Sequence, residues 1–133
     1  MSQSGEVEKG MQEVIGIMNR LEGVSLHRKV GGHFRFRMHL TDEMYDAPVD
    51  ALELSARPLN CLKRSGYDTV GKLAMAIDGG TDLKHMRGCG KDSVQMIMIR
   101  LFIYQYESMR PERRDDYLRE IALMNAYPLE SGE

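Results

Sequence analysis

The sequence predicts a mainly α-helical protein, a compact bundle of short helices with an N-terminal helix plus β-hairpin appendage and a C-terminal helix. Two patterns support this prediction. Apolar residues recur at helical spacing near both ends of the protein and in its middle. Between residues 48 and 111, glycine, serine and proline punctuate the sequence at short intervals, as expected of short helices joined by tight turns. The stretch 33–40 instead alternates apolar and polar residues, which is typical of a strand.

The N-terminal extension, residues 1–44, is predicted to hold one helix and one hairpin. The helix spans residues 6–21, and Gly23 favours its end. A strand over 24–29 and a second over 33–40 would join at Gly31-Gly32. An odd-length loop or a bulge brings the apolar side chains of the hairpin to one face, because a slip of one residue would turn them over. These side chains are Val24, Leu26, Phe34, Phe36 and Met38.

The central module, residues 45–108, follows a polar connector over 41–47. Pro48 opens it, Ser55 is the expected N-cap of its first helix, and Gly66 ends that helix. The turn Asp78-Gly79-Gly80 separates the second helix from a third, very short one. The predicted helices cover residues 56–65, 69–77, 81–87 and 91–106.

The helix 91–106 is apolar on nearly its whole circumference, so we expect it to be buried on two sides. One face carries Val94, Ile97, Met98, Leu101 and Tyr104, and another carries Met96, Ile99, Phe102, Ile103 and Tyr106. The N-terminal extension, a second copy of the protein, or the last segment must cover the second face. That last segment, residues 109–133, is predicted to form a helix over 112–125 that Pro128 ends.

Composition narrows the class of protein. The sequence has 133 residues, 42% hydrophobic content and a formal net charge of −2. This charge excludes a protein that coats nucleic acid by charge alone, so any DNA binding should be local and weak. Cys61 and Cys89 form no disulfide framework, and the N-terminus lacks a signal-peptide pattern. The apolar run 94–103 contains Arg100 and is too short to span a membrane. We therefore expect a cytoplasmic protein.

Two motifs indicate contact with a sugar-phosphate backbone. Gly88-Cys89-Gly90-Lys91 is typical of a tight turn that feeds a helix, and Ser93 lies in the first turn of that helix. A helix start presents unpaired N–H groups and a partial positive charge, which suit phosphate. Arg57 and Asn60 lie in the opening turn of another predicted helix. Both motifs also allow simpler interpretations: Arg57 could pair with Asp50 or Glu53, and the glycines could serve the turn alone.

Residues 48 to about 101 resemble the C-terminal domain of the bacterial RNA polymerase α subunit. The most specific part is Asn60-Cys61-Leu62-Lys63, with Arg57 before it and Gly90-Lys91 followed by Ser93 after it. No segment resembles the α N-terminal assembly domain, which predicts a free-standing module. The remaining matching residues are Pro48-Val49-Asp50, Leu52-Glu53-Leu54-Ser55, Thr69-Val70-Gly71 and Leu73.

The resemblance implies a helix-hairpin-helix-like fold that binds the minor groove of A·T-rich DNA and acts in transcription. Together with the turn glycine Gly88, the implied DNA-binding residues are Arg57, Asn60, Cys61, Gly90, Lys91 and Ser93. The family's σ-facing acidic surface corresponds to Asp50 and Glu53. Besides weakly bound DNA, σ factor, transcription activators and RNA polymerase are the candidate partners, and the resemblance implies no cofactor.

The sequence departs from the family at four places. Asp92 stands where a second basic residue is usual, and Met96 stands where a polar contact residue is usual. Ala51 replaces an acid of the σ-facing surface, and two extra residues lie between Gly71 and Gly90. The first two departures weaken the DNA prediction. The alternative is a protein-interaction or dimerisation module of the transcription machinery.

Neither catalysis nor metal binding is predicted. We find no nucleophile–base pair, P-loop or metal-ligand motif. His27, His33 and His39 invite a metal interpretation, but His33 and His39 would lie about 20 Å apart on one strand and cannot share an ion. The basic strand face that also holds Arg35 and Arg37 is best interpreted as solvated charge.

Overall fold

The computed structural model describes residues 3–18, 38–80, 83–86 and 88–125. Within these ranges the protein is helical, as predicted, and it forms no strand beyond an isolated bridge between Pro48 and Thr69. The α-helices are α1 (Gln3–Met18), α2 (Asp42–Asp46), α3 (Ala56–Arg64), α4 (Val70–Asp78), α5 (Lys91–Ser108) and α6 (Pro111–Asn125). Two 3₁₀ helices accompany them, η1 (Val49–Leu52) and η2 (Leu83–His85).

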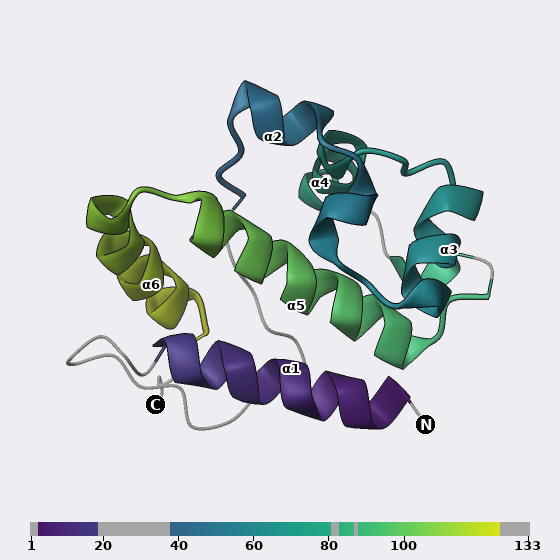
Figure 1. Cartoon of the computed structure of the whole chain (residues 1–133), viewed down its shortest axis with the longest axis horizontal. Helices are drawn as coiled ribbons and strands as arrows, with labels where there is room; N and C mark the ends of the chain where they lie inside the picture. Colours follow the sequence, from purple (N-terminus) through teal and green to yellow (C-terminus); the bar gives the residue numbers. More distant parts are fainter. Residues whose placement is uncertain (1–2, 19–37, 81–82, 87, 126–133) are drawn as a thin grey trace.

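Figure 1 shows α5 running through the middle of the molecule. α1 lies along one side of it, α2, α3 and α4 lie on the other side, and α6 packs near its C-terminal end. A single long helix therefore joins the central module to both flanking segments. This arrangement explains the apolar circumference of α5, because helices cover it on more than one side.

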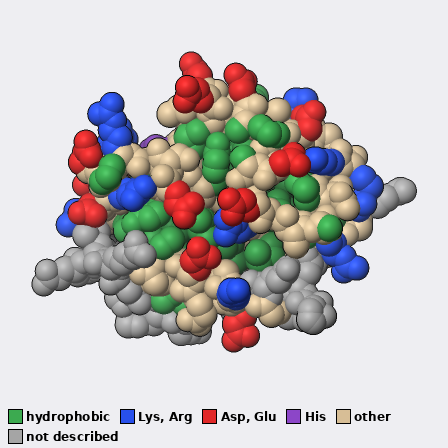
Figure 2. All heavy atoms as spheres, in the orientation of Figure 1, with side chains coloured by type: hydrophobic (Ala, Val, Ile, Leu, Met, Phe, Trp, Pro, Cys, Tyr) green, Lys and Arg blue, Asp and Glu red, His purple; other side chains and the backbone are tan. Residues whose placement is uncertain are grey.

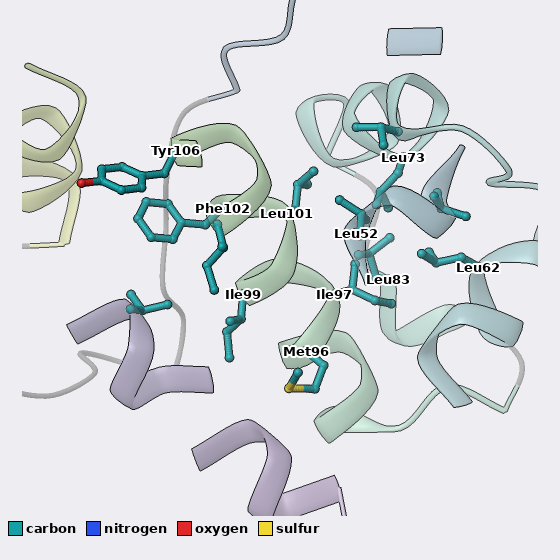
Figure 3. Close-up of a cluster of buried hydrophobic side chains, with 14 of the residues drawn as sticks. Leu52, Leu62, Leu73, Leu83, Met96, Ile97, Ile99, Leu101, Phe102 and Tyr106 are labelled. Atoms are coloured by element: carbon teal, nitrogen blue, oxygen red, sulfur yellow. The ribbon is translucent and has the colours of Figure 1, made fainter. Parts of the chain in front are cut away.

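The core around α5 has two parts (Figure 3). Ile97 faces Leu52 and Leu83 on the side of the central module, and all three are buried. Ile99 and Phe102 point away from that group, toward the side where α1 and α6 lie. The N-terminal and C-terminal helices, which were two of the three predicted covers, therefore both bury the second face.

Several predicted boundaries shift. α1 begins three residues before the predicted start at Glu6, and the predicted end at Leu21 lies outside the described residues. The polar connector 41–47 contains α2, whose N-cap Thr41 accepts a hydrogen bond from the Met44 N–H at 3.2 Å. Pro111 opens α6 at its first position, where proline costs little.

The predicted β-hairpin is not supported. Its first strand and most of its second, residues 24–37, lie outside the described residues. Its last three residues, Met38 to Leu40, are described and are not in a strand. The backbone N–H of His39 instead donates to Oε1 of the fully buried Gln105 at 2.6 Å, which anchors this segment on α5.

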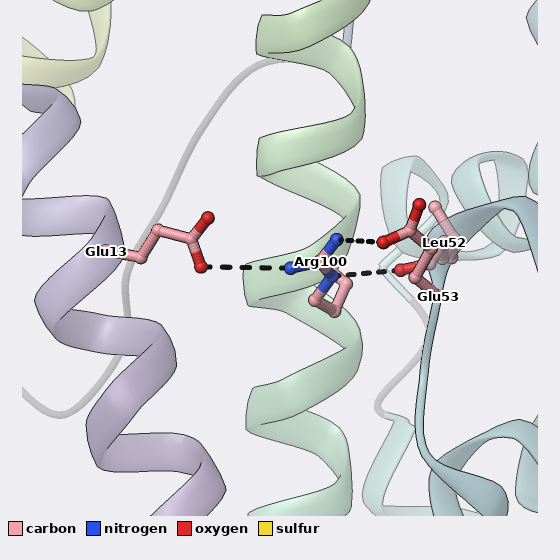
Figure 4. A network of polar contacts seen from close by, with 4 residues as sticks. All are labelled: Glu13, Leu52, Glu53 and Arg100. Carbon is pink, nitrogen blue, oxygen red and sulfur yellow. Dashed lines mark hydrogen bonds and ion pairs between the residues drawn. The ribbon is translucent and has the colours of Figure 1, made fainter.

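Arg100 ties three segments together (Figure 4). Its Nε donates to the Leu52 carbonyl at 2.9 Å, and its guanidinium lies 3.4 Å from a Glu53 carboxylate oxygen and 3.8 Å from one of Glu13. Glu53 ends η1 with φ at 59°, a conformation that costs a non-glycine residue energy. The hydrogen bond from Arg100 to the Leu52 carbonyl helps to hold this turn, and the contact between Arg100 and Glu13 links α1 to α5.

Candidate nucleic-acid interface

A shallow hollow of about 570 Å³ lies where α3 meets the turn before α5. Arg57 and Asn60 of α3 line it, and Gly88 lines it from the turn. The two predicted motifs, which are distant in the sequence, therefore share one surface. Arg57 and Asn60 are exposed because they lie on the outer face of α3, opposite the buried Pro58, Cys61 and Leu62.

Arg57 does not form the ion pairs that were the simpler interpretation. The Asp50 carboxylate binds Lys63 Nζ at 2.9 Å, and Glu53 contacts Arg100. The Arg57 side chain makes no hydrogen bond or ion pair with any other residue that the structure describes. Its guanidinium is therefore available to a ligand.

Arg64 also lines the hollow, although it was not among the predicted site residues. Its Nη2 lies where a β-carbon on Gly88 would approach it to 2.6 Å, so the guanidinium covers the turn closely. The spacing of Arg64 from the predicted site residues could have identified it. Arg57, Asn60 and Arg64 are residues i, i+3 and i+7 of one helix, and such residues share a face.

The turn before α5 is held from below by Cys61. Its Sγ donates to the Gly88 carbonyl at 3.2 Å, and the side chain is fully buried. Gly88 has φ at +74°, where glycine is favoured. Burial, followed by the hydrogen bond with Cys61, raises the pKa of the Cys89 thiol to about 12. The Cys89 thiol therefore stays protonated near neutral pH and serves packing.

The start of α5 differs from that turn. Gly90 is the N-cap, with φ at −80° and no side-chain cap, and a β-carbon there would meet no described atom within 4 Å. The fold itself therefore does not require a glycine at this position. Lys91 is exposed beside it, whereas Asp92 adds a carboxylate to the same helical turn.

Two of the predicted DNA-binding side chains are interior. Cys61 and Ser93 are both fully buried, so they can act on the surface only through the residues that they hold in place. The residues that the structure leaves at the surface are Arg57, Asn60, Gly88, Gly90 and Lys91. The hollow itself includes Arg57, Asn60 and Gly88, and Gly90-Lys91 follow from its edge.

The predicted partner-facing acids are exposed and already paired within the protein. The hydrogen bond from Lys63 lowers the pKa of Asp50. This pair links η1 to α3, and Glu53 with Arg100 links η1 to α5. Both carboxylates remain largely at the surface, with 51% and 79% of their side chains exposed.

α1 reaches the face of α5 that continues from this interface. Gly10 of α1 packs so closely that a β-carbon there would lie 3.2 Å from Ile99 Cγ2 and 3.7 Å from Met96 Sδ. Met96 is 8% exposed as a result. α1 therefore occupies the place where the resemblance implies a polar contact residue.

The described residues offer no alternative metal centre, since they contain no group of three His, Cys, Asp or Glu side chains placed to hold an ion. His39 contacts Glu120 at 3.2 Å, and His27 and His33 lie outside the described residues. None of the described helices combines the length and apolar character needed to cross a bilayer.

Comparisons with known proteins confirm the resemblance. Residues 38–101 match the family model of the C-terminal domain of the bacterial RNA polymerase alpha subunit. A DNA-directed RNA polymerase subunit alpha from Rubrobacter xylanophilus is 42% identical over 67 residues, which are 50% of this protein and 20% of the relative. One from Carboxydothermus hydrogenoformans is 35% identical over 60 residues, 45% of this protein and 18% of the relative.

The sequence thus spans about a fifth of the length of these curated relatives. The matched region includes every residue of the candidate interface and ends within α5. α1 and α6 lie outside the residues matched by the family model. No solved structure matches the protein significantly.

Proposed function

We propose that this protein is a DNA-binding module acting in bacterial transcription, similar to the RNA polymerase α C-terminal domain. One observation carries the proposal. Arg57 and Asn60 share a surface hollow with the turn that leads into α5, and the Arg57 side chain has no partner among the described residues. The matched family model spans this whole surface, which supports the proposal.

The chemistry of the surface suits a sugar-phosphate strand. An arginine side chain is favoured in a narrow, electronegative minor groove, so Arg57 would insert there with Asn60 beside it. The N-terminal turn of α5 would receive a phosphate, with Lys91 adding charge. Gly90 would allow the backbone to come close to that phosphate, which explains a glycine that the fold does not require.

Cys61 and Ser93 would act as positioning residues in this scheme. The Cys61 thiol fixes the Gly88 carbonyl, and Ser93 is buried in the first turn of α5. A second basic residue is usual where this sequence has Asp92. Arg64 would supply that second cation instead, because its guanidinium lies over the same turn. We expect weak binding, with a Kd of about 10⁻⁴–10⁻⁶ M, since few cations contact the backbone.

Fluorescence anisotropy with an A·T-rich duplex at two salt concentrations tests the proposal. We expect binding to weaken as salt rises and Arg57→Ala to cost about 1–3 kcal/mol. Arg119→Ala, an exposed arginine on α6, is the matched control and should change little. Binding that is absent, insensitive to salt, or equally sensitive to both variants would contradict the proposal.

A second candidate function is a protein-interaction module of the transcription machinery. The burial of Met96 under α1 and the carboxylate of Asp92 favour it, because both reduce the surface open to DNA. Asp50 and Glu53 would then contact σ factor, an activator or the polymerase. Light scattering after size-exclusion chromatography tests whether the partner is a second copy: a dimer supports self-association, and a strictly monomeric protein excludes it.

A further inference from the structure

The opposite end of α5 carries a second surface groove, which we call the α5–α6 groove. It measures about 450 Å³ and lies between the segment that enters α2 and the turn from α5 to α6. Leu40, Met44 and Met109 give it apolar walls, and Arg110 and Arg113 stand at its side. The wall formed by residues 108–113 lies outside the matched family region, whereas the opposite wall lies within it.

The groove is preformed. The His39 N–H binds the buried Gln105 amide, and its ring meets the edge of Tyr117 at a centroid distance of 5.2 Å. Thr41 caps α2 and so places Met44. These contacts fix the wall before any ligand arrives, which lowers the entropy cost of binding.

Its charge is unbalanced. Arg110 and Arg113 are both exposed, and neither forms an ion pair with another described residue. Their neighbour Arg114 differs, because its guanidinium donates to the carbonyls of Tyr106 and Glu107 at 3.0 Å and lies over the Tyr106 ring. Arg114 therefore serves the fold, whereas the side chains of the two other arginines have no such structural task.

A second hollow of about 410 Å³ extends the groove along α6 and shares His39, Met109 and Arg113 with it. Its acids already have partners: Glu120 contacts His39 at 3.2 Å and Asp116 contacts Arg119 at 3.7 Å. Neither acid forms an ion pair with Arg110 or Arg113. The surface is thus elongated, apolar at its walls and cationic on one side.

We infer that the α5–α6 groove is a docking site for an acidic peptide segment of a partner protein, with an apolar side chain as its anchor. Methionine side chains adapt to differently shaped apolar groups, which suits Met44 and Met109 to this role. Arg110 and Arg113 would each bind a carboxylate through paired N–H donors. A DNA duplex fits poorly, because its surface is mostly phosphate and sugar and offers these walls little apolar area.

Figure 2 shows how charged side chains are distributed over one face of the molecule. On the face shown, Asp and Glu side chains gather over the middle of the molecule, Lys and Arg side chains gather over α3, and side chains of both charges lie at the α6 end. The surface over α3 and the surface at the α6 end are thus separate. An acidic partner at one end would leave the other end open to DNA.

An NMR titration of the full-length ¹⁵N-labelled protein tests this inference. The probe is the synthetic peptide acetyl-Glu-Glu-Leu-Glu-Glu-amide, and the same peptide with glutamines in place of glutamates is the charge control. At ~1 mM peptide we expect shift changes confined to residues 39–44 and 108–117, with a far smaller response to the glutamine peptide.

Variants make the test specific. Arg110→Glu with Arg113→Glu should weaken peptide binding by roughly tenfold or more, because two attractive contacts become repulsive. Arg119→Glu, a charge reversal on the same helix and outside the groove, should leave binding nearly unchanged. A circular dichroism melt checks that all variants fold.

Three results would overturn the inference: no shift changes at the groove, changes of equal size around Arg57 and Lys91, or peptide binding that survives the double reversal. If the double reversal instead weakens duplex binding while the peptide never binds, the basic end serves DNA and the inference is wrong. The proposed DNA interface is judged separately, by the effect of Arg57→Ala on duplex affinity.

Discussion

The two ends of α5 use polar side chains in opposite ways. At the N-terminal end, the side chains of Arg57 and Lys91 are exposed and make no polar contact with the rest of the described residues. At the C-terminal end, Gln105 and Arg114 are committed to holding neighbouring segments in place. Gln105 and Arg114 therefore cannot also serve a ligand. Arg110 and Arg113, which form no ion pair with another described residue, stand beside apolar walls, so the N-terminal end is the better candidate for DNA.

The two ends of α5 also differ in the apolar side chains that pack around them. The C-terminal end stacks the rings of Phe102, Tyr106 and Tyr117, with centroid distances of 6.1 and 6.0 Å. The N-terminal end has a tight turn and a thin layer of small side chains beneath it, Cys61 and Ser93. Stability should therefore depend most on the C-terminal end, and DNA affinity on the N-terminal end.

The largest expected effect follows from replacing Phe102 by alanine. Phe102 is fully buried between two aromatic rings, so truncation leaves a cavity and should lower the free energy of unfolding by about 3–5 kcal/mol. Urea denaturation measures it, with Met75→Ala, whose side chain is 65% exposed, as the control expected within about 0.5 kcal/mol. A small loss for Phe102→Ala would show that the two ends do not differ in this way.

Much of the packing around the C-terminal end of α5 could be predicted from the spacing of apolar residues. The residues 91–106 are apolar on two faces, which correctly predicted cover on both sides of α5. The sequence could not choose among the possible covers, because that choice depends on how α1 approaches through Gly10 and how α6 turns back after Pro111. α2 was missed because five residues hold too little periodicity to show a helix.

The candidate interface was only partly readable. Short motifs predicted that Arg57, Asn60 and the glycine turn share one surface, which the common hollow supports. Burial of Cys61 agrees with the usual role of cysteine in helix packing, whereas burial of Ser93 was not evident, because a small polar side chain fits either side of a helix. Arg64 was not predicted, although its spacing from Arg57 was sufficient to place it on the same face.

A smaller difference in stability should distinguish substitutions at Gly88 and Gly90. Gly88→Ala forces a side chain into φ +74° and against Arg64, so we expect a loss of about 1–2 kcal/mol of stability. Gly90→Ser meets open space and adds an N-cap hydroxyl, so stability should rise by a few tenths of a kcal/mol, ~0.3. Thermal unfolding of the two variants measures the difference.

The duplex affinity of the same variants sharpens the comparison. If a phosphate approaches Gly90, the serine variant should bind DNA more weakly although it is at least as stable. Equal affinity for the serine variant and the parent protein would place the phosphate elsewhere. Equal stability losses in both variants would instead mean that Gly90 is a structural residue like Gly88.

The smallest effect concerns Asp92, the acidic residue in the first turn of α5. Its charge stabilises the helix dipole by about 0.3–1 kcal/mol, so Asp92→Lys should cost that much stability. The added cation should tighten duplex binding several-fold, ~3–10, at low salt and steepen the salt dependence by about one counterion. Asp92→Asn removes the charge without adding one and should fall between the two in affinity.

The Asp92 variants also identify what limits the N-terminal end of α5. One outcome is that the lysine variant gains duplex affinity that Arg57→Ala in the same background then loses. In that case the Asp92 carboxylate alone weakens DNA binding at this end, and the rest of the interface is intact. If Asp92→Lys leaves affinity unchanged, the obstruction lies in α1 over Met96, which no change in charge can remove. The difference between the two ends would then come from what the flanking helices cover.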